Sequence, residues 1–322
     1  MFPPLFNFVL QKMTKLVDNG TIEFQFLAFF SNHEKQPLLF TFFLLVYLIG
    51  LLGNLIIITV ICADFHLHTP MYFFLCNLSF IDISYTTVTL PKLMDMLLTG
   101  NNSISFVQCF TQMFFFTLLV VIEVVLLSSM AYDRFIAICN PLQYQLIMNR
   151  KVCVLLLVGI WIQGCLNSAV LTIFVFSLPL CYSKKMKHFF CNIKALVEIS
   201  CPDRRFDALF HVEVVIFGLG PLFLSMSSYI MIIKVVLSIS ASGRRKTFST
   251  CTSHLTVLLM FYGTILFMYM RPTSRYSGVL DQASTVMYAA VAPMLNPLIY
   301  SLRNKEVKYA LIQITRNKKD SI

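Results

Sequence analysis

Charged residues are scarce in this chain. Asp, Glu, Lys and Arg make up 12% of its 322 residues, whereas the hydrophobic types make up 57%. A soluble domain usually carries about 25% charged residues. A water-soluble fold could not cover so much apolar surface with so few charges. The composition therefore excludes an ordinary soluble domain and favours a protein that resides in a lipid bilayer.

Motifs of enzymes and of transporters are also missing. The sequence contains no glycine-rich phosphate loop, no HExxH zinc motif and no paired CxxC motif. It contains no Gly/Ser-rich linker, and no internal repeat of the kind that the two halves of a transporter share. The formal net charge of +10 arises from basic residues between apolar runs, which favours a membrane face over nucleic acid. We therefore expect no enzyme, no transporter or channel, and no nucleic-acid partner.

What the sequence does contain is apolar runs of membrane-spanning length. A spanning helix needs about 20 mostly apolar residues. Seven stretches meet this requirement, at residues 38–62, 70–91, 106–131, 152–178, 212–234, 247–270 and 282–302. The predicted fold class is an all-α membrane protein, a seven-transmembrane helix bundle in a single domain. Because seven is odd, the N-terminal segment 1–37 and the tail 303–322 lie on opposite faces of the membrane.

Three features indicate that the N-terminus is extracellular. Basic clusters at 150–151 and 244–246 adjoin span ends, which the positive-inside rule assigns to the cytoplasm. Glycosylation sequons begin at Asn19 and Asn101, both on the opposite face. Four cysteines also lie on that face, as expected for an oxidising compartment, and the sequence alone does not choose among their pairings. They are Cys109, Cys181, Cys191 and Cys201.

Two carboxylates lie deep in the predicted spans, Asp82 and Glu123. A buried charge is costly, so each should face the bundle interior and have a partner. Two neighbouring acids cannot both ionise cheaply without a cation. One interpretation is an internal sodium or proton site that includes Asn54 and is coupled to conformation. The other is a pair of polar packing residues satisfied by Asn54, Ser129 or Asn296. We expect no other cofactor and no transition-metal site.

Two motifs lie near the cytoplasmic ends of spans three and seven. In Asp133-Arg134 the arginine can form a local ion pair, and breaking that pair would free its donors for other partners. The alternative is an ordinary interfacial arginine that snorkels. Residues 296–300 read Asn-Pro-Leu-Ile-Tyr. Pro297 removes one helical hydrogen bond, so it makes either a moving part or a static kink.

The segment that follows span seven has one apolar face. Val307, Ala310, Leu311 and Ile314 are spaced to fall on it, and Arg303, Lys305 and Lys308 fall elsewhere. This pattern predicts a short amphipathic helix over 303–315 that lies on the inner leaflet.

Together these motifs resemble the signatures of the olfactory (odorant) receptor family of rhodopsin-like G-protein-coupled receptors. The matching segments keep their order and spacing from about residue 13 to the end of the chain. They are 67–75 with Asp82, 130–139, 228–229, 246–255 and 293–304. The chain departs from the family pattern at Phe135, which replaces a tyrosine, and at Thr247, which replaces an alanine. Residues 1–12 also extend the N-terminus beyond the usual length.

The resemblance implies disulfides, a ligand site and an activation switch. Cys109 would pair with Cys191, and Cys181 with Cys201. A small, mostly apolar odorant would bind among the outer halves of spans three, five, six and seven. Its lining would comprise Phe116, Thr117, Val120, Phe217, Tyr262, Ile265, Tyr269 and Val286. Binding would swing the inner end of span six outward, through a switch that comprises Asp133, Arg134, Tyr229, His254, Asn296, Pro297 and Tyr300.

The resemblance also implies partners and a location. The opened inner face would activate a stimulatory, olfactory-type G protein and raise cyclic AMP. Basic residues of the third inner loop and the tail would contact membrane lipids, and Asn19 would carry a glycan. The location would be the plasma membrane of olfactory sensory neuron cilia. The alternative is a receptor of the same fold for a non-odour small molecule outside olfactory tissue. The outer part of span three has no acidic residue, which argues against an amine ligand.

Overall fold

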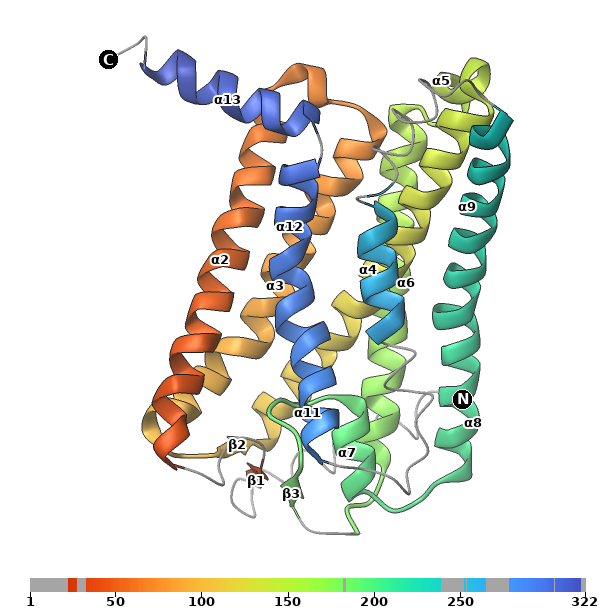
Figure 1. Cartoon of the computed structure of the whole chain (residues 1–322). Helices are drawn as coiled ribbons and strands as arrows, with labels where there is room; N and C mark the ends of the chain where they lie inside the picture. The colour runs from red at the N-terminus through yellow and green to blue at the C-terminus, as the bar shows by residue number, and fades with distance from the viewer. Residues whose placement is uncertain are drawn as a thin grey trace.

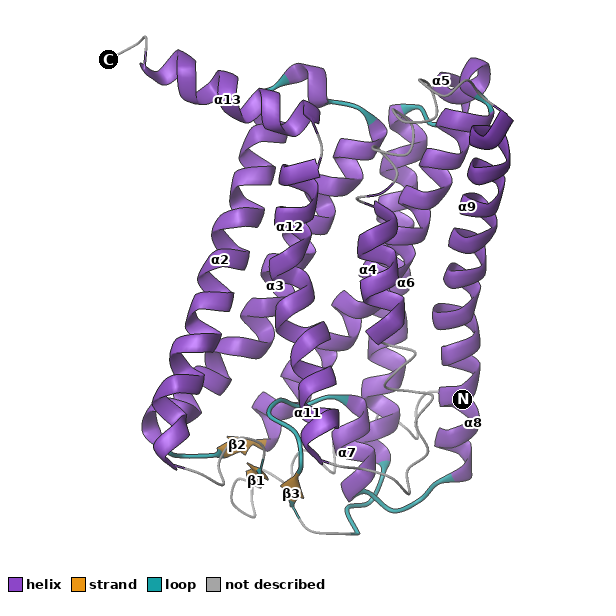
Figure 2. Ribbon diagram, viewed as in Figure 1, coloured by secondary structure: helices purple, strands orange, loops and turns teal. Residues whose placement is uncertain are grey.

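A computed structural model describes residues 23–27, 33–181, 184–238, 252, 254–264, 278–303 and 305–319. Within these ranges long helices run side by side along one axis (Figure 1; Figure 2). Five are long and apolar enough to cross a bilayer. They are α2 (Gln36–Ala63), α3 (Pro70–Thr99), α4 (Phe106–Cys139), α6 (Arg150–Ser177), and a continuous segment formed by α8 (Arg204–Glu213), the π-helix η4 (Val214–Leu219) and α9 (Gly220–Ser238).

The sixth and seventh spans complete the bundle. The described part of the sixth span is helical over His254–Thr264. The seventh consists of α11 (Gly278–Val286), the π-helix η6 (Met287–Val291) and α12 (Ala292–Arg303). The seven-helix fold class is therefore confirmed.

Helix α13 (Lys305–Lys319) turns away from the bundle axis and lies across one end of the molecule (Figure 1). Val307 and Ala310 are buried, whereas Lys308 is exposed. The hydroxyl of Tyr72 in α3 donates to Oε2 of Glu306 at 2.7 Å, which fastens the helix to the bundle. The predicted amphipathic helix is confirmed, and the end that carries it is called the α13 end below.

Several helices are longer than their apolar runs. α3 continues past residue 91 to Thr99, where Gly100 adopts a left-handed φ of 72°. α4 continues past residue 131 to Cys139, and α8 begins at Arg204 rather than at 212. Hydropathy marks only the part of a helix that lies in hydrocarbon, whereas backbone hydrogen bonds and caps extend the helix into the polar region. Asp203 provides such a cap, since its side chain accepts from the backbone N–H of Arg205.

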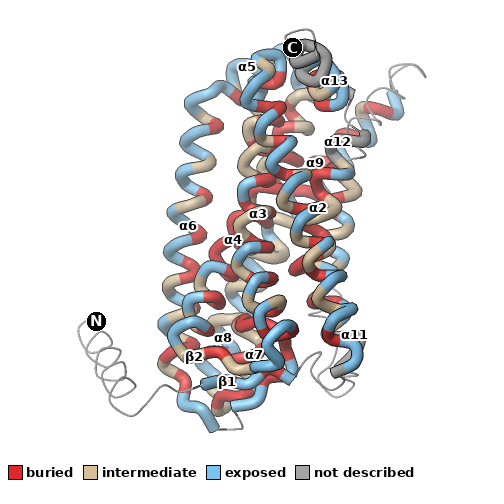
Figure 3. The backbone as a smooth tube through the Cα atoms, turned by 90° about the vertical axis from the view of Figure 1, so that its left-hand side faces the viewer, coloured by how far each residue is buried: buried red, intermediate tan, exposed pale blue. Residues whose placement is uncertain are grey.

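Small residues bring the helices close together. A Cβ atom on Gly164 of α6 would lie 2.8 Å from Cγ1 of Ile122 in α4. The hydroxyl of Ser168, one turn further along α6, donates to the carbonyl of Phe114 at 2.6 Å. Within lipid, such close contact and interhelical hydrogen bonding replace the hydrophobic effect as the source of packing energy. The remaining surface of α6 is largely exposed or half-buried, as suits a lipid-facing helix (Figure 3).

A small sheet covers the opposite end, called the sheet end below (Figure 1). Strand β1 (Glu23–Phe26) pairs antiparallel with β2 (Ser103–Ser105) and parallel with β3 (Lys185–Met186). Its side chains alternate between exposed and buried, and Phe24 and Phe26 are completely buried. Helix α7 (Ile193–Ile199) lies in the same region. Neither this sheet nor this helix is predicted from the sequence.

The remaining short elements join the long helices. They are η1 (His33–Lys35), η2 (Phe65–Leu67), η3 (Pro141–Gln143) and α5 (Tyr144–Ile147). The last two lie in the loop between α4 and α6 at the α13 end.

Candidate ligand cavity and switch

A cavity of about 170 Å³ lies between the helices toward the sheet end. Four of the residues that the resemblance places around a ligand line it. They are Phe116, Thr117, Val120 and Phe217. Ile265 and Tyr269 fall outside the described residues. The wall is completed by side chains that the sequence analysis did not name as ligand contacts, among them Tyr85, Asn167, Leu171, Lys194, Phe210, Glu213, Phe261 and Tyr288.

Tyr262 and Val286 are not among the lining residues, whereas their neighbours Phe261 and Tyr288 are. A shift of one residue along an α-helix turns a side chain by about 100°. The π-helix η6 begins directly after Val286 and changes this rotation further. Counting positions back from a motif therefore does not give the right face in the seventh span.

An aromatic cluster forms one wall of the cavity. The Phe116 ring lies 4.7 Å from that of Phe190, 4.9 Å from Tyr85 and 5.9 Å from Tyr288, between ring centroids. These tilted and edge-on arrangements are the preferred geometries of aromatic pairs. The cluster joins α3, α4, η6 and the loop after α6 around one centre, which provides a rigid, apolar surface for a ligand.

The loop over the cavity is fixed in two ways. Disulfides join Cys109 to Cys191 and Cys181 to Cys201, the pairing that the resemblance implies. In addition, the backbone N–H of Cys191 donates to Oε1 of Gln112, whose Nε2 donates to the carbonyl of Val88, both at 2.8 Å. Gln112 thus connects the loop to α3 and α4. The only sequence signal for this role was an amide within an apolar span.

The internal polar site contains Asp82, which is 1% exposed, and Glu123, which is 3% exposed. Nδ2 of Asn296 donates to both carboxylate oxygens of Asp82, at 3.0 and 3.1 Å. Nδ2 of Asn54 instead donates to the carbonyls of Gly50 and Pro293. Of the expected partners, Asn296 therefore contacts Asp82, while Asn54 links α2 to the seventh span beside this pair.

The ion pair at the end of α4 involves a third residue. Nε and Nη2 of Arg134 donate to Oδ2 of Asp133 at 3.0 and 2.6 Å. The hydroxyl of Tyr144, from α5, donates to Oδ1 of Asp133 at 2.8 Å. Burial and the adjoining Asp133 raise the pKa of Tyr144, so its hydroxyl stays protonated. The ion pair is predictable from the sequence, whereas the contact with Tyr144 is not, because that residue belongs to no motif.

The other switch residues connect the sixth and seventh spans to neighbouring helices. The hydroxyl of Tyr229 lies 2.6 Å from Nδ1 of His254, both of them buried, which joins α9 to the sixth span. Pro297 packs against Gly53 of α2, where a Cβ atom would lie 3.0 Å from the proline ring. The side chain of Tyr300 is outside the described part of the structure.

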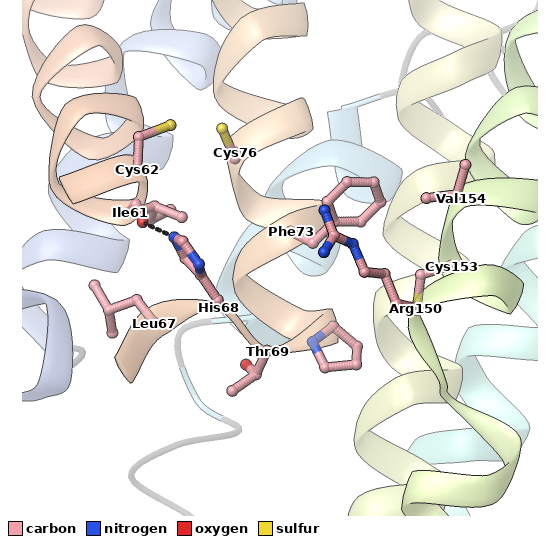
Figure 4. A pocket seen from close by; sticks show the side chains of 11 residues that line it. Ile61, Cys62, Leu67, His68, Thr69, Phe73, Cys76, Arg150, Cys153 and Val154 are labelled. Carbon is pink, nitrogen blue, oxygen red and sulfur yellow. Dashed lines mark hydrogen bonds between the residues drawn. The ribbon is translucent and has the colours of Figure 1, made fainter. Parts of the chain in front are cut away.

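A second cavity, of about 350 Å³, lies toward the α13 end between α2, α3 and α6 (Figure 4). The sulfur atoms of Cys62 and Cys76 point toward each other in it, and Arg150 extends toward Phe73. Nε2 of His68 lies 3.1 Å from the carbonyl of Ile61, so this histidine caps the end of α2. Four of the residues that the resemblance places around a ligand line the first cavity, and none of the eight is among the residues that line this one.

This arrangement defines a class of protein before any sequence comparison. The structure matches the crystal structure of squid rhodopsin with a TM-score of 0.70, over 88% of this chain and 81% of that chain, at 17% identity. Identity this low shows a shared fold, which is the seven-helix bundle of rhodopsin-like receptors.

Sequence comparison then gives the family. The family model described as "Olfactory receptor" matches residues 43–318. Human olfactory receptor 8H1 is 47% identical over 297 residues, which cover 90% of this chain and 94% of that protein. Mouse olfactory receptor 5AR1 is 44% identical over 303 residues, which cover 92% of this chain and 96% of that protein. The chain belongs to the olfactory receptor family. It is a multi-pass plasma-membrane receptor of the G-protein-coupled type and not an enzyme.

Proposed function

We propose that this receptor detects a small, mostly apolar odorant in the sheet-end cavity and activates a stimulatory, olfactory-type G protein, which raises cyclic AMP. The observation that carries the proposal is the course of α4. Phe116, Thr117 and Val120 of this helix line the cavity, and Asp133 and Arg134 form the ion pair near its other end. One helix thus connects the cavity with an ion pair that can break on activation.

The volume and lining of the cavity support a small ligand. Pockets for drug-sized molecules measure about 300–1,000 Å³. The cavity of about 170 Å³ is smaller and has a mainly aromatic and aliphatic wall. A volatile molecule of few heavy atoms fits such a space, and its affinity comes mainly from burial of apolar surface.

We also propose that the sheet end is extracellular and that the α13 end faces the cytoplasm. Both disulfides lie near the sheet end, and disulfides persist in oxidising compartments. Arg150 and the basic residues of α13 would then adjoin anionic lipids of the inner leaflet. Asn19 lies outside the described residues, and its glycosylation remains part of this proposal, as does a location in olfactory cilia.

Activation would rearrange the contacts at the α13 end. A ligand that binds the open arrangement more tightly shifts the population toward it. Opening would separate Arg134 from Asp133 and Tyr229 from His254, which exposes polar groups to the G protein. Two neighbouring buried carboxylates repel each other unless one is neutralised, so Asp82 and Glu123 would attract a cation. A cation held more tightly in one arrangement would stabilise that arrangement over the other.

A cyclic AMP reporter assay tests the proposal. Cells that co-express the receptor and an olfactory-type G protein are challenged with a panel of small odorants of several chemical classes. We expect a dose-dependent response that is absent from mock-transfected cells and from cells that express Arg134→Ala at a normal surface level. Silence across the panel despite surface expression would overturn the proposal in favour of a non-odour ligand or another G protein.

A further inference from the structure

One part of the cavity wall is polar, and it has a buried amide whose hydrogen-bonding capacity is not fully used. Asn167 of α6 lines the cavity and is 8% exposed. Its Nδ2 is buried and makes no hydrogen bond of full geometry within the described part of the chain, and its polar neighbour is the carboxyl of Glu213. An amide nitrogen carries two N–H donors, so one carboxyl neighbour leaves hydrogen-bonding capacity that a ligand acceptor can use.

A carboxyl group lies beside this donor. Glu213, the last residue of α8, lines the same cavity, and its carboxyl adjoins the Asn167 amide. The carboxyl oxygens are acceptors. The neighbouring Asn192 amide is less free to bind a ligand, because its Oδ1 already accepts from the N–H of Ala195 at 2.7 Å. Asn167 and Glu213 therefore offer one donor and one acceptor at adjacent points of an otherwise apolar wall.

The charges of the wall favour a neutral ligand. Lys194 of α7 also lines the cavity, so the described wall carries one basic and one acidic side chain. A carboxylate ligand would be attracted by Lys194 but repelled by Glu213, so it gains no net attraction. An ammonium ligand would be attracted by Glu213 but repelled by Lys194 and, having no lone pair, could not accept from Nδ2 of Asn167. An aldehyde or ketone could accept from Asn167 but has no proton to donate to Glu213.

The geometry points to an alcohol as the ligand class of this receptor. The hydroxyl oxygen accepts from Nδ2 of Asn167, and the hydroxyl proton is donated to the carboxyl of Glu213. The hydrocarbon part of the alcohol packs against the apolar wall, which includes Val120, Phe217 and Phe261. This inference rests on the proposed function and specifies which odorants the cavity accepts. On this inference, the acidic group that contacts the ligand lies in the fifth span and not in the third.

The test compares functional groups on identical carbon skeletons. Primary alcohols of four to ten carbons are assayed in the cyclic AMP reporter beside the matching aldehydes, ketones, amines and carboxylic acids. We expect half-maximal concentrations for the best alcohol to be about tenfold below those of the matching carbonyl compound, the effect of one hydrogen bond. A response to another class with none to alcohols would overturn the inference and leave the receptor function standing. Silence of every class would overturn both.

Two substitutions and a matched control separate recognition from folding. Asn167→Leu and Glu213→Leu should each raise the half-maximal concentration of the best alcohol about tenfold at an unchanged surface level. Glu213→Gln keeps an acceptor and should therefore have a smaller effect. Gln163→Leu removes a comparable amide from the exposed side of α6 and should leave the alcohol response unchanged. Equal losses for Gln163→Leu and Asn167→Leu would refute a specific role for Asn167.

Discussion

The Tyr144→Phe substitution offers the sharpest test of the switch. Asp133 is completely buried, and its carboxylate accepts from Arg134 through one oxygen and from Tyr144 through the other. The substitution removes the hydroxyl and keeps the ring, so the packing of α5 against the end of α4 should persist. Arg134 would then be paired with a carboxylate that has lost one of its donors.

The expected rise in basal signalling follows from the free energy of this hydrogen bond. A hydrogen bond to a charged group contributes about 1.5–3 kcal/mol, and complete burial of Asp133 favours the upper part of that range. If the bond exists only in the closed arrangement, its loss shifts the closed-to-open equilibrium by about 10–100-fold. A minor open state of about 0.1–1% would then become populated enough to signal without ligand. We expect basal cyclic AMP to rise about tenfold or more.

The assay measures ligand-free cyclic AMP, normalised to surface receptor. Tyr132→Phe is the matched control, because Tyr132 precedes Asp133 and no hydrogen bond joins its hydroxyl to that carboxylate among the described contacts. Basal signalling that stays at the wild-type level in Tyr144→Phe, at normal surface expression, would refute the reasoning. An equal rise in Tyr132→Phe would assign the effect to general loosening of α4.

Two further predictions concern the scaffold. Gly164→Ala should destabilise the receptor by about 1–3 kcal/mol, because the new methyl group would lie 2.8 Å from Cγ1 of Ile122, whereas Gly159→Ala meets no atom of the described residues within 4 Å and should be neutral or stabilising. Thermal unfolding of the detergent-solubilised receptor measures both, and equal melting temperatures would contradict the packing argument. Cys191→Ser should cost about 2–5 kcal/mol and sharply reduce surface expression, while Cys165→Ser, at an exposed free cysteine, should not. Flow cytometry of a tagged receptor would contradict this prediction if both variants reached the surface equally.

The helices could be predicted from the sequence because membrane insertion imposes a simple composition on them. The predicted start of α3 at residue 70 matches the structure, and the predicted start of α4 at 106 also does. The predicted ends of these two helices, at 91 and 131, precede the observed ends at Thr99 and Cys139, since a helix does not stop where its hydrocarbon environment ends. The sheet could not be predicted in the same way. Its strands span two to four residues, and their pairing depends on tertiary contacts between distant segments.

Within the site, the residues that the sequence predicts are those whose burial is unfavourable without a partner. Asp82 was identified because a carboxylate in an apolar span needs a partner, and the structure supplies Asn296. The amides of Gln112 and Asn167 also lie in apolar spans, so each is expected to have a hydrogen-bond partner. The sequence does not predict that the partner of Asn167 is Glu213, because that contact depends on how α6 packs against α8.

The matching family segments and the cavity lie in different parts of the molecule. Three matching segments lie toward the α13 end, where Tyr72 contacts α13 and where Asp133 binds Arg134. They are 67–75, 130–139 and the described part of the last segment, 293–303. Asn167 and Glu213 lie toward the sheet end, outside every matching segment. Sequence resemblance therefore identifies how the receptor couples to its G protein more readily than what it detects. The ligand must be inferred from the buried amide and the carboxyl group of the cavity, which is why the choice between an alcohol and a carbonyl compound is the decisive comparison for this receptor.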